Sequence, residues 1–253
     1  MRLKDKVAII TGAGQGLGRE FALRFAREGA KVVIAEIVGE KAWEVTREVE
    51  RLGGEGLNVR TDVRSGEDTE GMATTAVERF GRIDILVNNA ALYGGLPAKR
   101  WDGWTRDEWQ RSFEINVLGT WQCIKAVAPF MIKQGKGKII NLSSSTVEMG
   151  LPTLLPYTCT KGAVVAMTRV IAKSLGRYNI NVNCLSPGYT LTEGSLTRPG
   201  RTEETDTALI QGRCFRRHEY PEDIVGAVLF FASEESNFIT GQNLLVDGGE
   251  VMH

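Results

Sequence analysis

The sequence lacks both a long apolar run and a surplus of charge. No segment approaches the roughly 20 consecutive apolar residues that a transmembrane helix needs, and the opening MRLKDKVAIITG has too short an apolar stretch for a signal peptide. Lys and Arg together number 31, as do Asp and Glu, so the formal net charge is zero. Since binding to phosphate backbones needs a clustered positive surplus, we expect a cytoplasmic protein that binds neither membrane nor nucleic acid.

Metal-ligand patterns are also missing. The chain has only two histidines and no HExxH sequence, and its four cysteines are too far apart for CxxC or zinc spacing. These cysteines are Cys123, Cys159, Cys184 and Cys214. The sequence therefore predicts no metal site and reduced thiols.

Short apolar segments rich in β-branched residues are what the chain does have. They occupy residues 6–10, 31–35, 84–89, 138–143, 180–186 and 243–249. The segments 18–29 and 41–54 between them show helical periodicity, and each of these ends at a glycine. Near-continuous apolar strands are typical of parallel sheets buried on both faces. The pattern predicts an α/β fold, a Rossmann-type doubly wound parallel sheet flanked by helices on both faces.

No proline-rich linker, repeat or change of composition divides the chain, so residues 1–253 are expected to form a single domain. The least regular stretch is 187–220, which is rich in Thr, Arg, Gly and Glu. Because long loops in compact domains are usually functional, we interpret this stretch as a substrate lid.

The segment KVAIITGAGQGLGRE combines a strand, a glycine-rich turn and the start of a helix. Glycines permit a tight turn and close approach of a ligand, and a helix N-terminus offers free amides to a pyrophosphate. A strict G-x-G-x-x-G does not fit, since Leu17 and Arg19 occupy the possible third-glycine positions. The turn alone therefore leaves both a nucleotide site and a plain tight turn open.

Glu36 ends the second apolar segment, 18 residues after Gly18. An acidic side chain at this place can accept hydrogen bonds from an adenosine ribose, and it would repel a 2′-phosphate. The following Ile37 and Val38 supply no arginine for such a phosphate. The pattern favours NAD over NADP as the cofactor.

Taken together and in order, these motifs resemble the short-chain dehydrogenase/reductase family from Lys6 to Gly249. The TGxxxGxG turn of the family is present at Thr11–Gly18, its NNAG motif as NNAA at residues 88–91, its YxxxK as YTCTK, and its PGxxxT within SPGYTLT. The resemblance implies a cofactor site formed by Gly12, Gln15, Gly16, Leu17, Gly18, Glu36, Asp62, Val63, Asn89, Ala90, Tyr157, Lys161, Pro187, Gly188, Thr190 and Thr192. The alanine at Ala91 departs from the NNAG motif and affects the expected approach of the backbone to the cofactor.

The resemblance also implies four catalytic residues, namely Asn116, Ser144, Tyr157 and Lys161. Tyr157 and Lys161 lie four residues apart after Pro156, which suits the first turn of a helix, so both share one helix face. A free tyrosine has a pKa of about 10, and a nearby ammonium lowers it. Tyr157 would then exchange a proton with the substrate hydroxyl, and Ser144 would stabilise charge on the substrate oxygen. The family implies that Lys161 also holds the nicotinamide ribose and that Asn116 supports a water relay.

The residues next to the catalytic positions are apolar or aromatic, which suggests a hydrophobic secondary alcohol or ketone as the substrate. The candidates for this pocket are Leu92, Tyr93, Val147, Met149, Leu151 and Tyr189. The segments FEINV, FITGQ and VDGGEVMH are similar to those of bacterial secondary-alcohol dehydrogenases in this family, such as those acting on 1-phenylethanol.

Two other functions stay open. Arginines around the lid could bind the phosphate of a coenzyme A or carrier-protein thioester, which would make the chain a 3-oxoacyl-thioester reductase; they are Arg198, Arg201, Arg213, Arg216 and Arg217. Acidic residues within 203–206 dilute that patch. A non-catalytic NAD-binding sensor is the alternative of another class, although a sensor has no need of the four catalytic residues. The resemblance further implies a homotetramer that pairs helices around 107–134 and 157–176.

Overall fold

The computed structural model describes residues 1–196, 199 and 202–252. Within them, seven parallel strands form one sheet in the order β3-β2-β1-β4-β5-β6-β7. The strands are β1 Val7–Thr11, β2 Lys31–Glu36, β3 Glu55–Arg60, β4 Ile85–Asn88, β5 Gly137–Leu142, β6 Ile180–Pro187 and β7 Asn243–Val246. The strand order changes direction between β1 and β4, which is where ligands bind in doubly wound folds.

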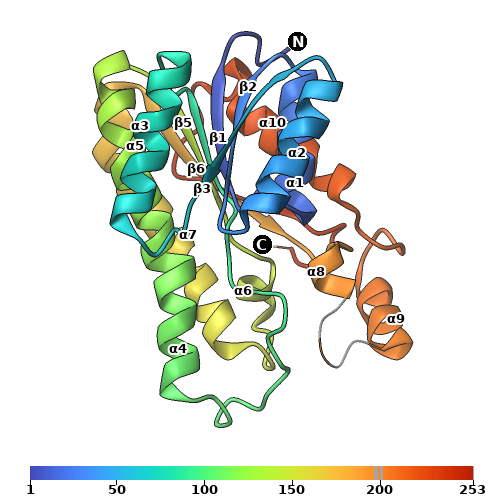
Figure 1. Cartoon of the computed structure of the whole chain (residues 1–253). Helices are drawn as coiled ribbons and strands as arrows, with labels where there is room; N and C mark the ends of the chain where they lie inside the picture. The colour runs from blue at the N-terminus through green and yellow to red at the C-terminus, as the bar shows by residue number, and fades with distance from the viewer. Residues whose placement is uncertain (197–198, 200–201, 253) are drawn as a thin grey trace.

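Helices cover the sheet in two layers (Figure 1). One layer consists of α1 Gly16–Arg27, α2 Gly39–Arg51 and α10 Pro221–Ala232. The other layer consists of α3 Gly66–Phe80, α5 Gly119–Gln134 and α7 Leu155–Leu175. This arrangement confirms the predicted Rossmann-type α/β fold with helices on both faces.

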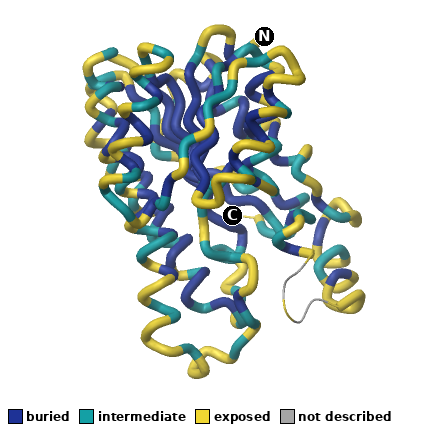
Figure 2. The backbone as a smooth tube through the Cα atoms, in the orientation of Figure 1, coloured by how far each residue is buried: buried dark blue, intermediate teal, exposed yellow. Residues whose placement is uncertain are grey.

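Successive side chains of each strand point to opposite faces of the sheet, which explains why helices cover both faces. In β1, Ile10 packs into the core beneath α1 and α10, while the preceding Ile9 packs into the core beneath α3 and α5. Both side chains are fully buried, and Figure 2 shows the central strands as a continuous buried block. Because both faces of the sheet are buried, the central strands have uninterrupted apolar sequences.

The sequence patterns predict six of the strands and miss β3. Glu55, Asn58 and Arg60 interrupt its apolar pattern, and Glu55 and Arg60 are exposed. Its position explains this composition, since β3 is the outermost strand and pairs only with β2. Residues at a sheet edge are less buried, so the apolar signal is weak there.

The helix expected around 107–134 is confirmed as a continuous helical segment. α4 Arg106–Phe113 begins with a capping box between Thr105 and Glu108, and a π-helical turn, Glu114–Leu118, joins it to α5. By length and composition alone the Arg106–Gln134 segment could cross a membrane. It packs against the sheet, with 44% of its most apolar window buried, and core helices of this kind meet the same criterion, so this is weak evidence of a span.

The stretch 187–220 is more regular than the sequence predicts. It contains two short helices, α8 Glu193–Leu196 and α9 Glu203–Gly212, while the positions 197–198 and 200–201 lie outside the described residues. α9 begins with a capping box between Thr202 and Thr205. In Figure 1 this region projects below the sheet, on the side of the strand carboxyl ends and beside the short helix α6 Thr146–Met149.

Gly18 has a packing role at the start of α1. A Cβ at this position would lie 2.3 Å from the carbonyl oxygen of Gly12 and 2.6 Å from Nδ2 of Asn89. Because these atoms belong to the glycine-rich turn and to the residue that follows β4, the first turn of α1 can lie this close only when residue 18 lacks a side chain.

We predict that Gly18→Ala lowers the free energy of unfolding by about 1–3 kcal/mol, the usual effect of overpacking. Gly39→Ala is the matched control, because a Cβ at the start of α2 meets no atom within 4 Å. Urea unfolding of both variants measures the difference. Equal stability of the two variants would contradict the packing role of Gly18.

Candidate active site

The glycine-rich turn is anchored to β4 through one hydroxyl group. Thr11 Oγ1 accepts hydrogen bonds from the backbone amides of Asn89 and Ala90, both at 3.1 Å. Asn89 Nδ2 donates to the carbonyl oxygens of Thr11 and Gly12, both at 3.0 Å. Gly12 and Gly16 have φ values of 62° and 54°, which other residues rarely adopt. The turn is thereby fixed at the N-terminus of α1.

Glu36 lies at the carboxyl end of β2 and faces the same turn. Its Oε2 accepts a hydrogen bond from the Gly14 amide at 3.1 Å, and its Oε1 accepts one from the Val38 amide at 3.2 Å. A Cβ on Gly14 would lie 2.8 Å from both Glu36 Cγ and Lys41 Cβ. Glu36 as a whole residue is only 9% exposed, and its carboxylate is held in place beside the cavity described below.

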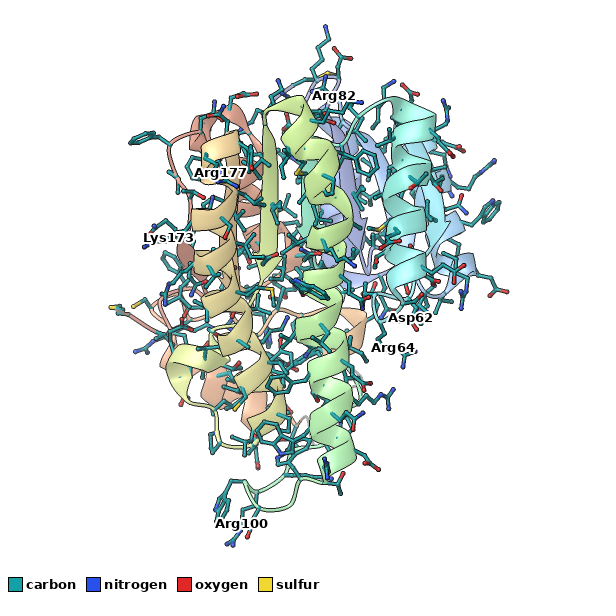
Figure 3. The ribbon with its side chains drawn as sticks, turned by 90° about the vertical axis from the view of Figure 1, so that its left-hand side faces the viewer. Asp62, Arg64, Arg82, Arg100, Lys173 and Arg177 are labelled. Carbon is teal, nitrogen blue, oxygen red and sulfur yellow. The ribbon has the colours of Figure 1, made fainter. Side chains whose placement is uncertain are left out.

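Asp62 lies just after β3, near the same end. Arg64 donates to both carboxylate oxygens, with an Nη2–Oδ2 distance of 2.6 Å, and the two side chains lie next to each other in Figure 3. These hydrogen bonds lower the pKa of the Asp62 carboxyl group. Its backbone amide donates to Asp68, which fixes the segment that follows β3.

Tyr157 and Lys161 lie in the first turns of α7, which begins at Leu155 with Pro156 as its second residue. Lys161 Nζ is 5.5 Å from the centroid of the Tyr157 ring and donates to the carbonyl oxygen of Leu142 at 2.7 Å. Both side chains are almost completely buried. Burial lowers the pKa of Lys161 to about 8, because the interior disfavours the charged ammonium.

Ser144 follows β5 and faces the same cavity as Tyr157. It is 8% exposed, and its Oγ accepts a hydrogen bond from the Thr146 amide at 3.3 Å. The neighbouring Ser143 donates to the backbone carbonyl of Lys161 at 3.0 Å. The end of β5 therefore holds both the serine and the start of α7 in one arrangement.

Asn116 is buried in the π-helical turn and is not among the residues that line the cavity. Its Oδ1 accepts a hydrogen bond from the Leu92 amide at 2.7 Å, and its Nδ2 donates to Thr160 Oγ1 at 3.0 Å. Asn116 thus connects the segment after β4 to α7, and it positions Tyr93, whose ring centroid lies 5.1 Å from that of Tyr157.

One cavity of about 890 Å³ joins most of the residues expected from the sequence. Those that line it are Gly12, Gln15, Gly16, Leu17, Glu36, Asp62, Val63, Asn89, Ala90, Leu92, Tyr93, Ser144, Met149, Leu151, Tyr157, Lys161, Pro187, Gly188, Tyr189, Thr190 and Thr192. Gly18 and Val147 are not among them. Gly18 packs against the turn as described above, and Val147 lies on α6, beside the cavity wall.

The structure adds lining residues that the sequence patterns did not identify. Several of them come from α9 and the C-terminal tail, namely Thr205, Ala208, Leu209 and Glu250, and others, such as Arg111 and Ile115, come from α4 and the π-helical turn. Nothing in the polar segment EETDTALIQG marks it as a cavity wall. The folding of α9 over the carboxyl ends of the strands brings Thr205, Ala208 and Leu209 to the cavity.

The arginines near the lid are mostly engaged. Arg213 is buried and pairs with Glu250 at 3.3 Å, and Arg217 pairs with Asp223 at 2.7 Å. Arg198 and Arg201 lie outside the described residues. Of the three described arginines in this segment, only Arg216 is exposed without an ion pair to a described residue, so they supply one free cation and not a basic patch.

The cavity brings groups suited to acid–base chemistry together with a polar region around the glycine-rich turn. The glycine-rich turn and Glu36 form a polar end. At the other end, Ser144 and Tyr157 lie among Tyr93, Met149 and Leu151. A hydroxyl or carbonyl group of a second molecule would meet the serine and tyrosine there.

Known proteins are similar to this chain over nearly its whole length. A family profile described as enoyl-(acyl carrier protein) reductase matches residues 12–250. The 7alpha-hydroxysteroid dehydrogenase of Escherichia coli (strain K12) is 37% identical over 251 residues, which cover 99% of this chain and 96% of that protein. The 3-oxoacyl-[acyl-carrier-protein] reductase of Thermotoga maritima is 34% identical over 252 residues, with both chains fully covered. A solved 7 alpha-hydroxysteroid dehydrogenase, complexed with NADH and 7-oxo glycochenodeoxycholic acid, has a TM-score of 0.93 at 36% identity and covers 100% of this chain and 96% of its own.

The burial of Lys161 gives a pH prediction. Its pKa of about 8 in the folded state lies below 10.5, so folding disfavours the ammonium below pH 8, and this unfavourable contribution disappears as pH rises from 8 to 10.5. The cost of burying the ammonium at pH 7 amounts to roughly 3 kcal/mol of folding free energy. The hydrogen bond to the Leu142 carbonyl offsets about 1 kcal/mol of this cost. Lys161→Met should therefore raise the free energy of unfolding at pH 7 by about 2 kcal/mol.

Urea unfolding at pH 7 and pH 10 checks this prediction. The gain should shrink at pH 10, where Lys161 is neutral in the folded wild type. Lys173→Met, at an exposed position of the same helix (Figure 3), is the control and should match the wild type at both pH values. A Lys161→Met protein that is less stable at pH 7 would contradict the dominant effect of burial.

Proposed function

Because the chain belongs to the short-chain dehydrogenase/reductase family, we propose that it is an NAD-dependent enzyme that transfers a hydride between NAD(H) and a hydrophobic secondary alcohol or ketone. The observation that carries this proposal is a single cavity that joins Ser144, Tyr157 and Lys161 to Glu36 and the glycine-rich turn. A proton-transfer group and a dinucleotide site are thus connected within one space.

The residues of this cavity fit a dinucleotide. The positive φ of Gly12 and Gly16 opens the N-terminus of α1, whose backbone amides suit a pyrophosphate. Glu36, Asp62 and Val63 line one end, where the adenosine would bind. We place the nicotinamide near Pro187–Thr192, which lines the cavity toward Tyr157.

In the oxidation direction, Tyr157 accepts the hydroxyl proton of the alcohol, while NAD supplies the hydride acceptor. Lys161 supports the phenolate, since its ammonium lies over the tyrosine ring. Ser144 donates a hydrogen bond to the substrate oxygen and stabilises the charge that develops there. In the reduction direction Tyr157 returns the proton to the ketone oxygen.

In this proposal Asn116 supports the site without lining the cavity. It is held between Leu92 and Thr160, and Thr160 lies in the same turn of α7 as Lys161. We assign it the positioning of these segments, with the water relay as the role that the family implies.

The lining of the cavity supports a hydrophobic substrate. Tyr93, Met149 and Leu151 face the space near Tyr157, and Leu209 of the lid helix lies at its border. A relative of known structure holds 7-oxo glycochenodeoxycholic acid, a ketone on a largely apolar ring system. We therefore favour a cyclic or aryl-substituted secondary alcohol.

A 3-oxoacyl-thioester reductase is the alternative, because a relative with that name is 34% identical. Such a substrate carries a phosphopantetheine arm that needs cations at the entrance. Arg213 is buried against Glu250 and Arg217 is paired with Asp223. The described part of the lid thus gives this alternative less support.

NAD is favoured over NADP by the contacts of Glu36. Both of its oxygens already accept backbone hydrogen bonds, and a 2′-phosphate would meet a fixed carboxylate. Lys41 lies nearby but donates to Gln15 Oε1.

We also propose a cytoplasmic homotetramer. α4–α5 and α7 lie side by side on one face of the molecule (Figure 3). Leu118, Trp121 and Val170 are 50%, 44% and 66% exposed there, which is unusual for large apolar side chains on adjoining helices. Pairing of this face with a second copy would cover them.

Tyr157→Phe should abolish turnover and leave NADH binding intact, because it removes the hydroxyl of the tyrosine whose ring lies 5.5 Å from Lys161 Nζ. The assay follows absorbance at 340 nm with a series of secondary alcohols and NAD⁺, and with an acetoacetyl thioester and NADH. We expect a fall of at least about 100-fold in kcat, the usual range for general acid–base catalysis. Tyr178→Phe, at the far end of α7, is the control and should keep full activity.

Substantial turnover by Tyr157→Phe would refute the catalytic assignment. Turnover of the thioester alone by the wild type would favour the reductase, and NADH binding without turnover of either substrate would favour the sensor.

Glu36→Gln should raise kcat/KM for NADP⁺ relative to NAD⁺ by roughly tenfold, since loss of one charge close to a phosphate is worth at least about 1.4 kcal/mol. Steady-state kinetics with both cofactors measure the ratio. Glu40→Gln, an exposed position at the start of α2, is the matched control. An unchanged ratio in Glu36→Gln would mean that another group selects the cofactor.

A further inference from the structure

The segment Pro187–Thr192 enters the cavity wall directly from β6, and the neighbouring strands and loops hold its backbone. The Pro187 carbonyl accepts a hydrogen bond from the Ser145 amide at 2.9 Å, and the Gly188 amide donates to the Val246 carbonyl at 2.9 Å. Beyond Gly188 the strand pairing ends. Hydrogen bonds with Ser195 of α8 hold Thr192, so a different contact must fix Thr190.

Glu219 makes that contact from the far end of the lid. An isolated β-bridge pairs Thr190 with Glu219, and the Leu191 amide donates to the Glu219 carbonyl at 2.8 Å. The two ends of the lid, 29 residues apart in sequence, are joined at this point. The bridge is the base from which α8 and α9 project.

The Glu219 side chain adds a buried hydrogen bond to the bridge. Its Oε1 accepts from Thr190 Oγ1 at 2.6 Å, and the residue is only 5% exposed. Its Oε2 has no hydrogen-bond partner and lies 2.7 Å from the place where a Cβ of Gly188 would be. The carboxyl group thus packs directly behind the backbone of the cavity wall.

The surroundings of Glu219 contain more carboxylates than cations. Arg213 approaches it from the end of α9, Asp223 from α10 and Asp247 from the end of β7. Arg213 is already paired with Glu250. Burial raises the pKa of Glu219 to about 7, and Asp247 and Asp223 add to this effect, while Thr190 and Arg213 oppose it.

We propose that Glu219 is a positioning residue that fixes the Gly188–Thr192 wall against the nicotinamide end of the cofactor and so controls cofactor affinity. The inference rests on the NAD site of the proposed function. Glu219 acts through Thr190 and Gly188 and does not itself contact the cavity, since it is absent from the lining residues.

The proposal has a charge-dependent consequence. An ionised carboxylate behind Gly188 favours a positively charged nicotinamide ring over the neutral reduced ring. Raising the pH through about 7 should therefore increase the ratio of the Kd for NADH to the Kd for NAD⁺. A role limited to folding stability would leave this ratio unchanged.

Fluorescence titration with NADH, and competition by NAD⁺, tests the proposal without turnover. Glu219→Ala loses the acceptor of the Thr190 hydroxyl and should raise the Kd for NADH about tenfold, as expected for one buried hydrogen bond. Glu219→Gln keeps the acceptor and should stay within about threefold of the wild type, but its Kd ratio should lose the component that titrates near pH 7. Glu222→Gln, an exposed carboxylate on α10, is the control and should behave as the wild type.

Thr190→Val removes the same hydrogen bond from its other side and keeps the test valid if Glu219→Ala does not fold. It should weaken NADH binding to a similar extent, and the double variant should be no weaker than either single one. A folded Glu219→Ala protein with wild-type affinity overturns the inference, as does a wild-type Kd ratio that Glu219→Gln reproduces at every pH. A wild-type protein that binds no NADH would instead refute the proposed function.

Discussion

The parallel pairing of β1 with β4 is the constraint on which the site depends, since it places the glycine-rich turn beside the segment that leads to Tyr93. Residues that follow the two strands are tied to each other through Thr11 and Asn89. The first turn of α1 can approach this junction because Gly18 has no side chain. Asn116 then holds Leu92, and through Thr160 it contacts α7. One continuous set of hydrogen bonds therefore connects the dinucleotide end of the cavity to the helix that carries Tyr157.

Burial of Lys161 lowers the stability of the fold, but it places the ammonium where it can act on Tyr157. The ammonium is surrounded by protein and has one backbone acceptor, the Leu142 carbonyl. No described carboxylate forms an ion pair with it, so burial disfavours the charge and a single hydrogen bond supports it. A cationic group poised in this way over a tyrosine ring can stabilise a phenolate, whereas a paired lysine would have its charge neutralised.

The sequence could predict most of this site because its motifs follow central strands. Buried strands have continuous apolar sequences, and the polar residues that interrupt them at their carboxyl ends are the ones that enter the cavity, as Glu36 and Ser144 do. The apolar pattern did not identify β3, because an edge strand is only partly buried. No sequence pattern identified Glu250 as a lining residue, because its position depends on a buried ion pair with Arg213, 37 residues away in sequence. Such contacts depend on tertiary packing, which local patterns do not record.

The segment 187–220 combines a base that is held by backbone and side-chain contacts with a helix, α9, that lines the cavity. Its base is held by the Thr190–Glu219 bridge and by Arg213, which donates to the Tyr189 carbonyl at 3.1 Å. The side chains of α9 that line the cavity, among them Ala208 and Leu209, take no part in the hydrogen bonds that hold that base. Substitutions on α9 can therefore reshape the substrate end without moving Tyr189 or Thr190. Under the proposed function, such a division would let α9 select the substrate while the cofactor wall stays in place.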